Sequence, residues 1–306
     1  MTAQLGALPR RDLGASGLGV TTLGYGAMEL RGTLRRGGRP IDPAAATQVL
    51  NAVLDSGITF IDTSIDYGGS EEHIGAAIAH RRDEYVLASK AGCPLEHMPE
   101  HVGSLPHDYS RGNIVAGVEQ SLRRLRTDHL DLLQIHLSPS RQVIERDGVL
   151  ETLAALRDSG KVRLAGISST LPNVWDHLEL GGFETYQVPF SALERDHEAV
   201  IGAAAEAGAG VIVRGGVAKG EPGVGQGSGE RWAGWGVAAL DDLLDGDTRT
   251  GFLLRYTIST PGVSTTIVGS LNPGHVRANA RSAARGPLPA DVYAEARRRV
   301  MADPPR

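Results

Sequence analysis

Short apolar segments alternate with amphipathic stretches along most of the chain. Eight of these segments are rich in β-branched residues and too short for helices, which predicts eight strands. The expected strands are 20–25, 58–61, 85–89, 129–135, 162–167, 185–188, 210–213 and 265–268. Each is followed by a segment whose apolar positions recur with the period of a helix. The expected helices are 43–56, 70–80, 110–126, 143–158, 171–180, 194–207, 247–258 and 273–283.

Eight strand–helix units in a chain of 306 residues favour a (β/α)8 barrel over a doubly wound sheet. No interior stretch has the composition of a linker, so we expect residues 1–306 to form a single (β/α)8 barrel domain. A turn at residues 14–17 predicts an N-terminal hairpin that closes the N-terminal end of the barrel. Residues 289–300 predict an extra C-terminal helix. Active sites of such barrels lie at the C-terminal ends of the strands.

Composition and charge narrow the class of protein. The net charge is −5 with no long run of one sign, so a nucleic-acid partner is not expected. No apolar stretch approaches the ~20 residues of a membrane span, and residues 1–11 do not resemble a secretory signal. The single cysteine, Cys93, excludes an intramolecular disulfide. We therefore expect a cytoplasmic protein without a membrane partner, and the sequence carries no signal for an oligomeric state.

Four polar residues with complementary chemistry follow successive predicted strands. Asp62 and Tyr67 follow the second strand, Lys90 the third and His136 the fourth. A tyrosine side chain titrates near pH 10, and a neighbouring lysine cation lowers that value and eases proton transfer. An aspartate beside the lysine keeps it charged, and a histidine can hydrogen-bond a substrate oxygen. Such a set is suited to protonating a carbonyl oxygen while another group attacks the carbon.

Each of these residues also has an ordinary structural explanation when it is taken alone. Asp62 could cap a turn, Tyr67 could pack on the rim beside Gly68, and His136 could be a structural histidine. Lys90 is harder to explain in this way, because a lysine that ends a buried strand needs a partner. Lys90 also admits another class of enzyme, an aldolase or lyase that forms a Schiff base with its substrate.

Sequence motifs around the four residues resemble the aldo-keto reductase family over nearly the whole chain. The matching segments are 57–63 with 67–68 and 72–75, then 121–125, 131–136, 160–163, 166–168 and 267–270. The resemblance implies a (β/α)8 barrel that binds a nicotinamide cofactor across its mouth without a Rossmann domain. It implies that Tyr67 is the proton donor, with Lys90 as the partner that acidifies it. It further implies that Asp62 anchors Lys90 and that His136 orients the carbonyl.

The expected activity is therefore NAD(P)H-dependent reduction of an aldehyde or ketone to an alcohol, or the reverse oxidation. The partner would be a small-molecule carbonyl substrate. In some relatives a glutamate replaces the histidine and a carbon–carbon double bond is reduced, so His136 favours carbonyl chemistry. A non-catalytic NADP-binding sensor, as some relatives are, is the main alternative, and a Schiff-base enzyme that uses Lys90 is the other.

The resemblance also implies cofactor contacts at the remaining strand ends. Ser168, Ser169 and Gln187 would meet the nicotinamide carboxamide, although the family usually has asparagine where Ser169 stands. Arg214 stands where an aromatic residue often stacks on the nicotinamide, and it could stack on the ring or bind phosphate or substrate. The glycine-rich segment 215–229 could fold over the pyrophosphate, and the helix after the eighth strand offers its N-terminus to a phosphate. The remaining candidate cofactor contacts are Asp62, Gly215, Val217, Lys219, Gly269, Ser270, Asn272, His275 and Asn279.

Two further features concern the choice of cofactor and metal binding. NADPH-preferring relatives usually carry Lys or Arg near the turn after the eighth strand, where Arg277 is the nearest cation of this chain. We expect NADPH as the preferred cofactor, with NADH as the alternative.

His97, His101 and His107 follow the third strand, but their spacing fits no tetrahedral metal pattern, so no metal is expected.

Overall fold

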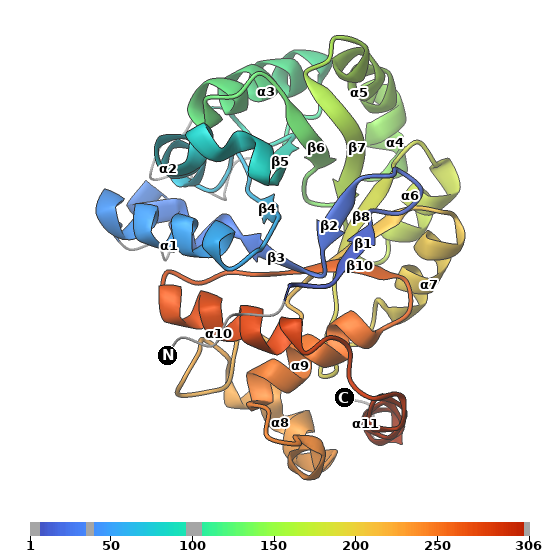
Figure 1. Cartoon of the computed structure of the whole chain (residues 1–306). Coiled ribbons are helices and arrows are strands. Elements are labelled where there is room, and N and C mark those ends of the chain that lie inside the picture. The colour runs from blue at the N-terminus through green and yellow to red at the C-terminus, as the bar shows by residue number, and fades with distance from the viewer. Residues whose placement is uncertain (1–6, 35–39, 96–105, 303–306) are drawn as a thin grey trace.

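Eight parallel strands close into a barrel in the computed structural model, which describes residues 7–34, 40–95 and 106–302 (Figure 1). The barrel strands are β3 (Leu23–Gly26), β4 (Phe60–Asp62), β5 (Val86–Ala91), β6 (Leu130–Ile135), β7 (Val162–Ser168), β8 (Thr185–Pro189), β9 (Gly210–Arg214) and β10 (Val263–Val268). They are hydrogen-bonded in chain order, and β10 closes the barrel between β9 and β3. The predicted (β/α)8 barrel is confirmed.

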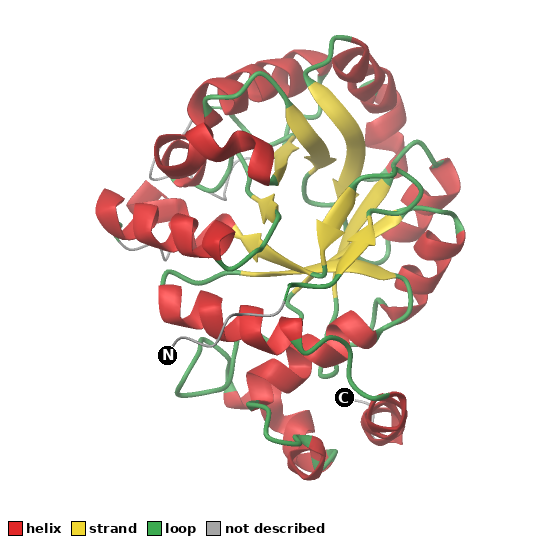
Figure 2. Cartoon of the chain, viewed as in Figure 1, coloured by secondary structure: helices red, strands yellow, loops and turns green. Residues whose placement is uncertain are grey.

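Helices surround the barrel on its outside (Figure 2). They are α1 (Pro43–Asp55), α2 (Ser70–Ile78), α3 (Arg111–Leu125), α4 (Arg141–Arg146), α5 (Val149–Asp158), α6 (Val174–Leu180), α7 (Glu198–Glu206), α8 (Gly229–Val237), α9 (Arg249–Ser259), α10 (Pro273–Ala284) and α11 (Ala290–Ala302). Several begin at a polar residue whose side chain accepts a hydrogen bond from the first turn, as Asp42 does for α1 and Ser110 for α3. The last helix, α11, is the expected C-terminal addition.

The N-terminal hairpin closes one end of the barrel. Strands β1 (Arg10–Asp12) and β2 (Gly19–Thr21) pair antiparallel and cross the barrel in the view of Figure 1. Leu13 and Val20 are fully buried in a cluster of residues from the interior of the barrel. Gly14 bridges to Ala209, directly before β9, so the hairpin covers the N-terminal ends of the strands, as predicted.

Three expected elements differ from the structure. The strand expected at 20–25 is divided, because residues 19–21 pair within the hairpin and the barrel strand begins at Leu23. The helix expected at 143–158 is two helices, since Gly148 adopts a φ of 60° between α4 and α5. Helix α8 was expected to be loop, because Gly229, Gly234 and Gly236 weaken its helical pattern.

The interior of the barrel has an apolar layer at one end and a polar layer at the other. Alternate strand residues face inward. The apolar layer, below which the hairpin packs, consists of Phe60, Val86, Ala88, Leu132, Leu164 and Ile212. Gly24 makes room for this layer, because a Cβ atom there would lie 2.8 Å from Phe60 Cδ1. Inward positions nearer the strand ends carry Asp62, Lys90, Gln134, Gln187 and Arg214, so the C-terminal mouth is polar.

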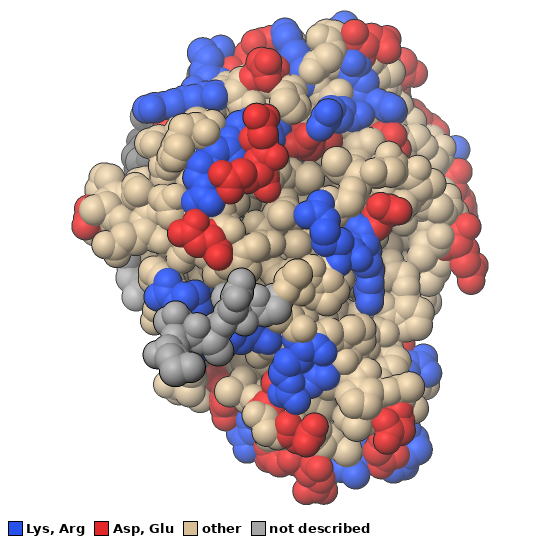
Figure 3. All heavy atoms as spheres, viewed as in Figure 1, with Lys and Arg blue, Asp and Glu red and all other residues tan. Residues whose placement is uncertain are grey.

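Basic and acidic side chains are both present on the face shown in Figure 3, in agreement with the mixed charge of the sequence. Within residues 7–34, 40–95 and 106–302, the structure contains no helix with the length and hydropathy needed to span a membrane.

Candidate active site

The C-terminal ends of the strands bring most of the predicted site residues to one mouth. Asp62 ends β4, Ser168 ends β7 and Arg214 ends β9. Lys90 is the penultimate residue of β5, and His136 directly follows β6. Tyr67 lies in the turn between β4 and α2, five residues beyond Asp62. The barrel topology therefore converts separated positions in the sequence into one constellation.

Lys90 and Asp62 form a buried ion pair at the centre of this mouth. Lys90 Nζ donates to Asp62 Oδ2 at 2.6 Å and to the carbonyl oxygen of Thr63 at 2.8 Å. The Lys90 and Asp62 side chains are only 0% and 2% exposed, respectively. Burial alone would lower the pKa of Lys90, but the charges and hydrogen bonds of Asp62 and Tyr67 outweigh it and raise that pKa above its ordinary value. Lys90 is thus a fixed cation.

Tyr67 lies between this cation and His136. Lys90 Nζ is 4.9 Å from the centroid of the Tyr67 ring. The Tyr67 and His136 rings meet edge to face, with centroids 6.1 Å apart and planes at 80°. Tyr67 is half-buried, whereas His136 is buried, so the phenol is the more accessible of the two side chains. The phenol and the imidazole can therefore approach the same small molecule at the mouth.

A chain of buried amides connects the ion pair to neighbouring strands. Asp62 Oδ1 accepts hydrogen bonds from Gln134 Nε2 at 2.8 Å and from Gln187 Nε2 at 2.9 Å. Ser168 Oγ in turn donates to Gln187 Oε1 at 3.1 Å. Gln134 is a site residue that the sequence analysis did not assign. Its signal was a polar side chain inside a fully buried strand, where it needs a partner.

Ser169 is engaged within the fold. Its hydroxyl is 2.9 Å from His177 Nδ1 and 2.8 Å from the Ser138 hydroxyl. His177 Nε2 lies 2.7 Å from the carbonyl oxygen of Pro139, which requires the proton to be on Nε2. Ser169 therefore donates to His177. Ser168, and not Ser169, is hydrogen-bonded to Gln187, which in turn donates to Asp62.

Arg214 reaches the same mouth from β9. Burial lowers the pKa of its guanidinium, against the charges of Tyr67, Glu194 and Asp62, which act in the opposite direction. The residue nevertheless keeps an exposed part. Arg214 is thus a cation that can contact a bound molecule from the side of β9.

The glycine-rich segment after β9 is folded around a tryptophan. Trp232 Nε1 donates to the carbonyl oxygen of Ala218 at 3.1 Å, and both Trp232 and Trp235 are buried. A Cβ atom at Gly227 would lie 2.0 Å from the carbonyl oxygen of Gly220, so this close packing requires glycine. These tryptophans pack against the backbone of the segment.

Two of the predicted cofactor contacts lie in this segment. Val217 is buried in the core, whereas Lys219 is exposed.

The turn after β10 carries a second group of predicted contacts. Asn272 caps α10 by accepting from Gly274 N at 2.8 Å, and Ser270 Oγ accepts from Asn272 N at 3.1 Å. His275 Nδ1 lies 3.4 Å from Ser270 Oγ. Asn279 lies farther along α10, away from its N-terminus. Arg277 lines an open hollow of about 530 Å³ together with Pro273 and residues of α1.

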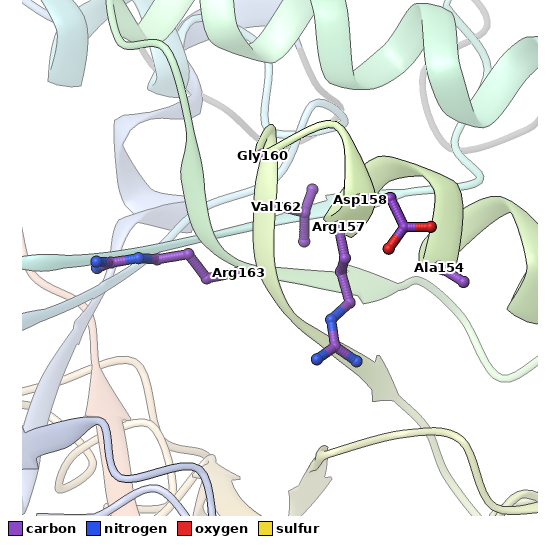
Figure 4. Close-up of a pocket in the computed structure, with 6 residues that line it drawn as sticks. All are labelled: Ala154, Arg157, Asp158, Gly160, Val162 and Arg163. Carbon is purple, nitrogen blue, oxygen red and sulfur yellow. The ribbon is translucent and has the colours of Figure 1, made fainter.

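A larger hollow of about 700 Å³ lies at the other end of the barrel (Figure 4). It is lined by Ala154, Arg157, Asp158, Gly160, Val162 and Arg163. Val162 begins β7, whereas Ser168 ends the same strand at the candidate site. This open hollow is therefore separate from the constellation at the C-terminal mouth.

Comparison with known proteins identifies the family. A sequence model of the Aldo/keto reductase family matches residues 22–221. The chain belongs to the aldo-keto reductase family. The family expected from the motifs is thus confirmed.

Relatives with similar sequences and structures support this assignment. This aldo-keto reductase superimposes on the holo form of AKR11C1 from Bacillus halodurans with a TM-score of 0.81 and 30% identity, over 95% of this chain and 96% of that chain. It is 29% identical over 291 residues to the uncharacterized oxidoreductase YqkF of Bacillus subtilis, covering 90% of each protein. It is also 32% identical over 175 residues to a D-threo-aldose 1-dehydrogenase from a Pseudomonas species, covering 51% of this chain and 52% of that protein.

Proposed function

We propose that this protein reduces the carbonyl group of an aldehyde or ketone with a nicotinamide cofactor. The observation that carries the proposal is the convergence of Tyr67 with the buried Lys90–Asp62 pair and His136 at one barrel mouth. A phenol, a fixed cation and an imidazole supply a proton, a charge that stabilises the resulting phenolate, and a hydrogen bond to the reacting oxygen.

In this proposal each side chain has one task. Tyr67 gives its hydroxyl proton to the carbonyl oxygen. Lys90, held by Asp62, stabilises the negative charge that the proton leaves behind on Tyr67. His136 directs the same oxygen toward Tyr67; since its Nδ1 lies 3.0 Å from Cys93 Sγ, Nε2 is the nitrogen for the substrate. The reverse sequence oxidises an alcohol by the same residues.

The donor set of the mouth fits a nicotinamide cofactor. Ser168 and the amide of Gln187 each keep further hydrogen-bonding capacity beyond their contacts with each other and with Asp62, and together they match the donor and acceptor groups of a carboxamide. At Gly269 a Cβ atom would lie 2.6 Å from the carbonyl oxygen of Gly26, so close packing against β3 requires glycine at this position. The bound cofactor would supply the hydride for the carbonyl carbon.

Other predicted residues would hold the remainder of the cofactor. Arg214 would contact the nicotinamide or its phosphate, and Ser270, Asn272 and His275 would bind a phosphate at the N-terminus of α10. Lys219 and Gly215 would lie along the pyrophosphate. We propose NADPH as the preferred cofactor and NADH as the alternative.

The first experiment is a fluorescence titration of the protein with NADPH and with NADH, followed by turnover on a panel of aldehydes, ketones and sugars. We expect saturable binding, tighter for NADPH, and turnover of at least one carbonyl class. Tight binding without turnover on any member of the panel would favour the sensor and contradict the reductase proposal.

The surroundings of Lys90 disfavour the Schiff-base alternative. A nucleophilic amine must be neutral and reachable, whereas Lys90 is 1% exposed, charged and bonded to Asp62 and to the carbonyl oxygen of Thr63. We expect borohydride to trap no carbonyl compound on Lys90. A trapped adduct located at Lys90 by peptide mass mapping would favour an aldolase or lyase.

A further inference from the structure

A thiol and two imidazoles meet beside the candidate active site. Cys93 follows β5, His136 follows β6, and His107 precedes α3. One ligand atom from each residue lies within 4.8 Å of those of the other two. Cys93 Sγ is 3.0 Å from His136 Nδ1, and the His107 and His136 rings have centroids 5.8 Å apart. In the proposed reduction Cys93 only holds Nδ1 of His136, and His107 has no assigned role.

The segment that carries His107 is held in place by Tyr109. Tyr109 Oη donates to the carbonyl oxygen of His136 at 2.6 Å, and its ring stacks on that of His107 with centroids 5.9 Å apart. The ring also lies against Gly92, where a Cβ atom would come within 2.5 Å of Tyr109 Cε1. Gly92, with a φ of 94°, directly precedes Cys93. Tyr109 therefore contacts His107, the backbone of His136 and the residue before Cys93, and so holds the three ligand residues near one another.

We propose that Cys93, His107 and His136 form a binding site for one soft divalent metal ion, of which Zn²⁺ is the representative. Sulfur and imidazole nitrogen are the ligands that Zn²⁺ prefers. Binding replaces the thiol proton of Cys93 with a sulfur–metal bond, so one proton is released for each ion bound. With one thiolate and two neutral imidazoles, the bound site carries a net charge of about +1, and water takes the fourth position.

The geometry requires only small movements to accept the ion. Tetrahedral bonds of about 2.3 Å to sulfur and about 2.0–2.1 Å to nitrogen place ligand atoms about 3.3–3.6 Å apart. Cys93 and His136 are slightly closer than this at 3.0 Å, and His107 lies within 4.8 Å of both. Because His107 is half-buried while the other two are buried, the ion enters from its side. His107 must therefore move closer to the other two ligands to complete the site.

The ion also affects catalysis, a consequence that rests on the proposed function. Once its Nδ1 is bound to the metal, the His136 ring cannot turn to follow the carbonyl oxygen, and the added positive charge lies near Tyr67. We therefore expect Zn²⁺ to lower the turnover of the reductase by at least about tenfold, and a chelator to restore it.

Binding is tested first, on the full chain without affinity-tag histidines, so that the result does not depend on any enzymatic activity. Titration with Co²⁺ should give one equivalent of bound ion with the absorption of a tetrahedral site and a thiolate-to-cobalt charge-transfer band. Zn²⁺ should displace it and abolish the absorption. Absence of a stoichiometric charge-transfer band would overturn the proposal.

Three variants locate the ion. Cys93→Ser should abolish the charge-transfer band, and His107→Ala should weaken binding by at least about tenfold. His80→Ala, which removes an exposed histidine elsewhere, should bind as the wild type does. His107→Ala keeps the test valid if Cys93→Ser is unstable, since His107 is only half-buried. Equal Co²⁺ affinity in wild type and His107→Ala would contradict the assignment.

The activity arm compares each variant with and without Zn²⁺. Wild type and His80→Ala should lose turnover in Zn²⁺, whereas His107→Ala should lose much less relative to its own rate without metal. Equal inhibition of all three would show that Zn²⁺ acts elsewhere. Since the Co²⁺ arm needs no substrate, failure of the reductase proposal would leave the metal site testable.

Discussion

Lys90 Nζ lies 2.6 Å from Asp62 Oδ2, and this ion pair is almost completely enclosed by the barrel. Removing one partner of such a pair leaves an uncompensated buried charge, which costs far more than loss of a surface pair. The pair is joined to the two neighbouring amides by Asp62 Oδ1, so one carboxylate organises the polar layer of the mouth.

Asp62→Asn should therefore destabilise the protein by about 3–5 kcal/mol and strongly reduce turnover. Chemical denaturation measures the first effect and steady-state kinetics the second. Asp55→Asn is the matched control, because Asp55 pairs with Arg81 while its side chain is 66% exposed, and it should cost only about 0–1 kcal/mol. Similar losses for the two variants would argue against a special role for the buried pair.

Tyr67→Phe should abolish reduction and leave cofactor binding nearly intact, because it removes one hydroxyl and keeps the ring. Loss of a general acid lowers kcat by about 10²–10⁴-fold. Tyr293→Phe, on α11, removes a hydroxyl 3.4 Å from Thr260 Oγ1 and should retain wild-type turnover. A Tyr67→Phe enzyme with most of its turnover would remove Tyr67 from the role of proton donor.

Arg214→Ala should weaken cofactor binding more than it changes selectivity among carbonyl substrates. The side chain is a cation that reaches the mouth from β9, where the cofactor is proposed to lie. Fluorescence titration gives the change in Kd, and kcat/KM ratios for pairs of substrates give the change in selectivity. Arg157→Ala, at the hollow of Figure 4, should leave both quantities unchanged. Unaltered cofactor affinity in Arg214→Ala would contradict this placement.

Burial of His177 should make the stability of the protein sensitive to acid. Burial is the main cause that lowers the pKa of His177 below its ordinary value of 6.5, against opposing effects of Pro139 and Asp176. The unfolded chain then binds a proton at His177 more readily than the folded protein does. Stability from this group is therefore complete above about pH 6.5 and falls as the pH decreases toward the lowered pKa.

Comparison of variants isolates this contribution. His177→Gln should show a smaller loss of unfolding free energy between pH 6.5 and more acidic values than the wild type. His80→Gln, which removes an exposed imidazole elsewhere, is the matched control for the substitution itself. Parallel curves for His177→Gln and wild type would show that His177 is not the titrating group.

The local pattern of apolar and polar residues was sufficient to predict most of the strands and helices. Strand and helix periods depend on neighbouring residues, so the barrel, its hairpin and its last helix could be predicted. The errors arose where local signals were ambiguous. Only Thr22 separates the second hairpin strand from the first barrel strand, Gly148 interrupts one helix, and the glycines of α8 obscure another.

The sequence by itself determined that an aspartate, a tyrosine, a lysine and a histidine lie at or shortly beyond the ends of strands, because the position of a residue relative to a strand is a local property. Only the tertiary structure decided which other side chains meet them. Gln134 contacts Asp62 across 72 positions of sequence, and His107 meets Cys93 through the segment that Tyr109 anchors. His97 and His101 lie outside the described residues. Such contacts depend on strand register and on the course of loops, which are set when the barrel closes and leave no periodic signal in the chain.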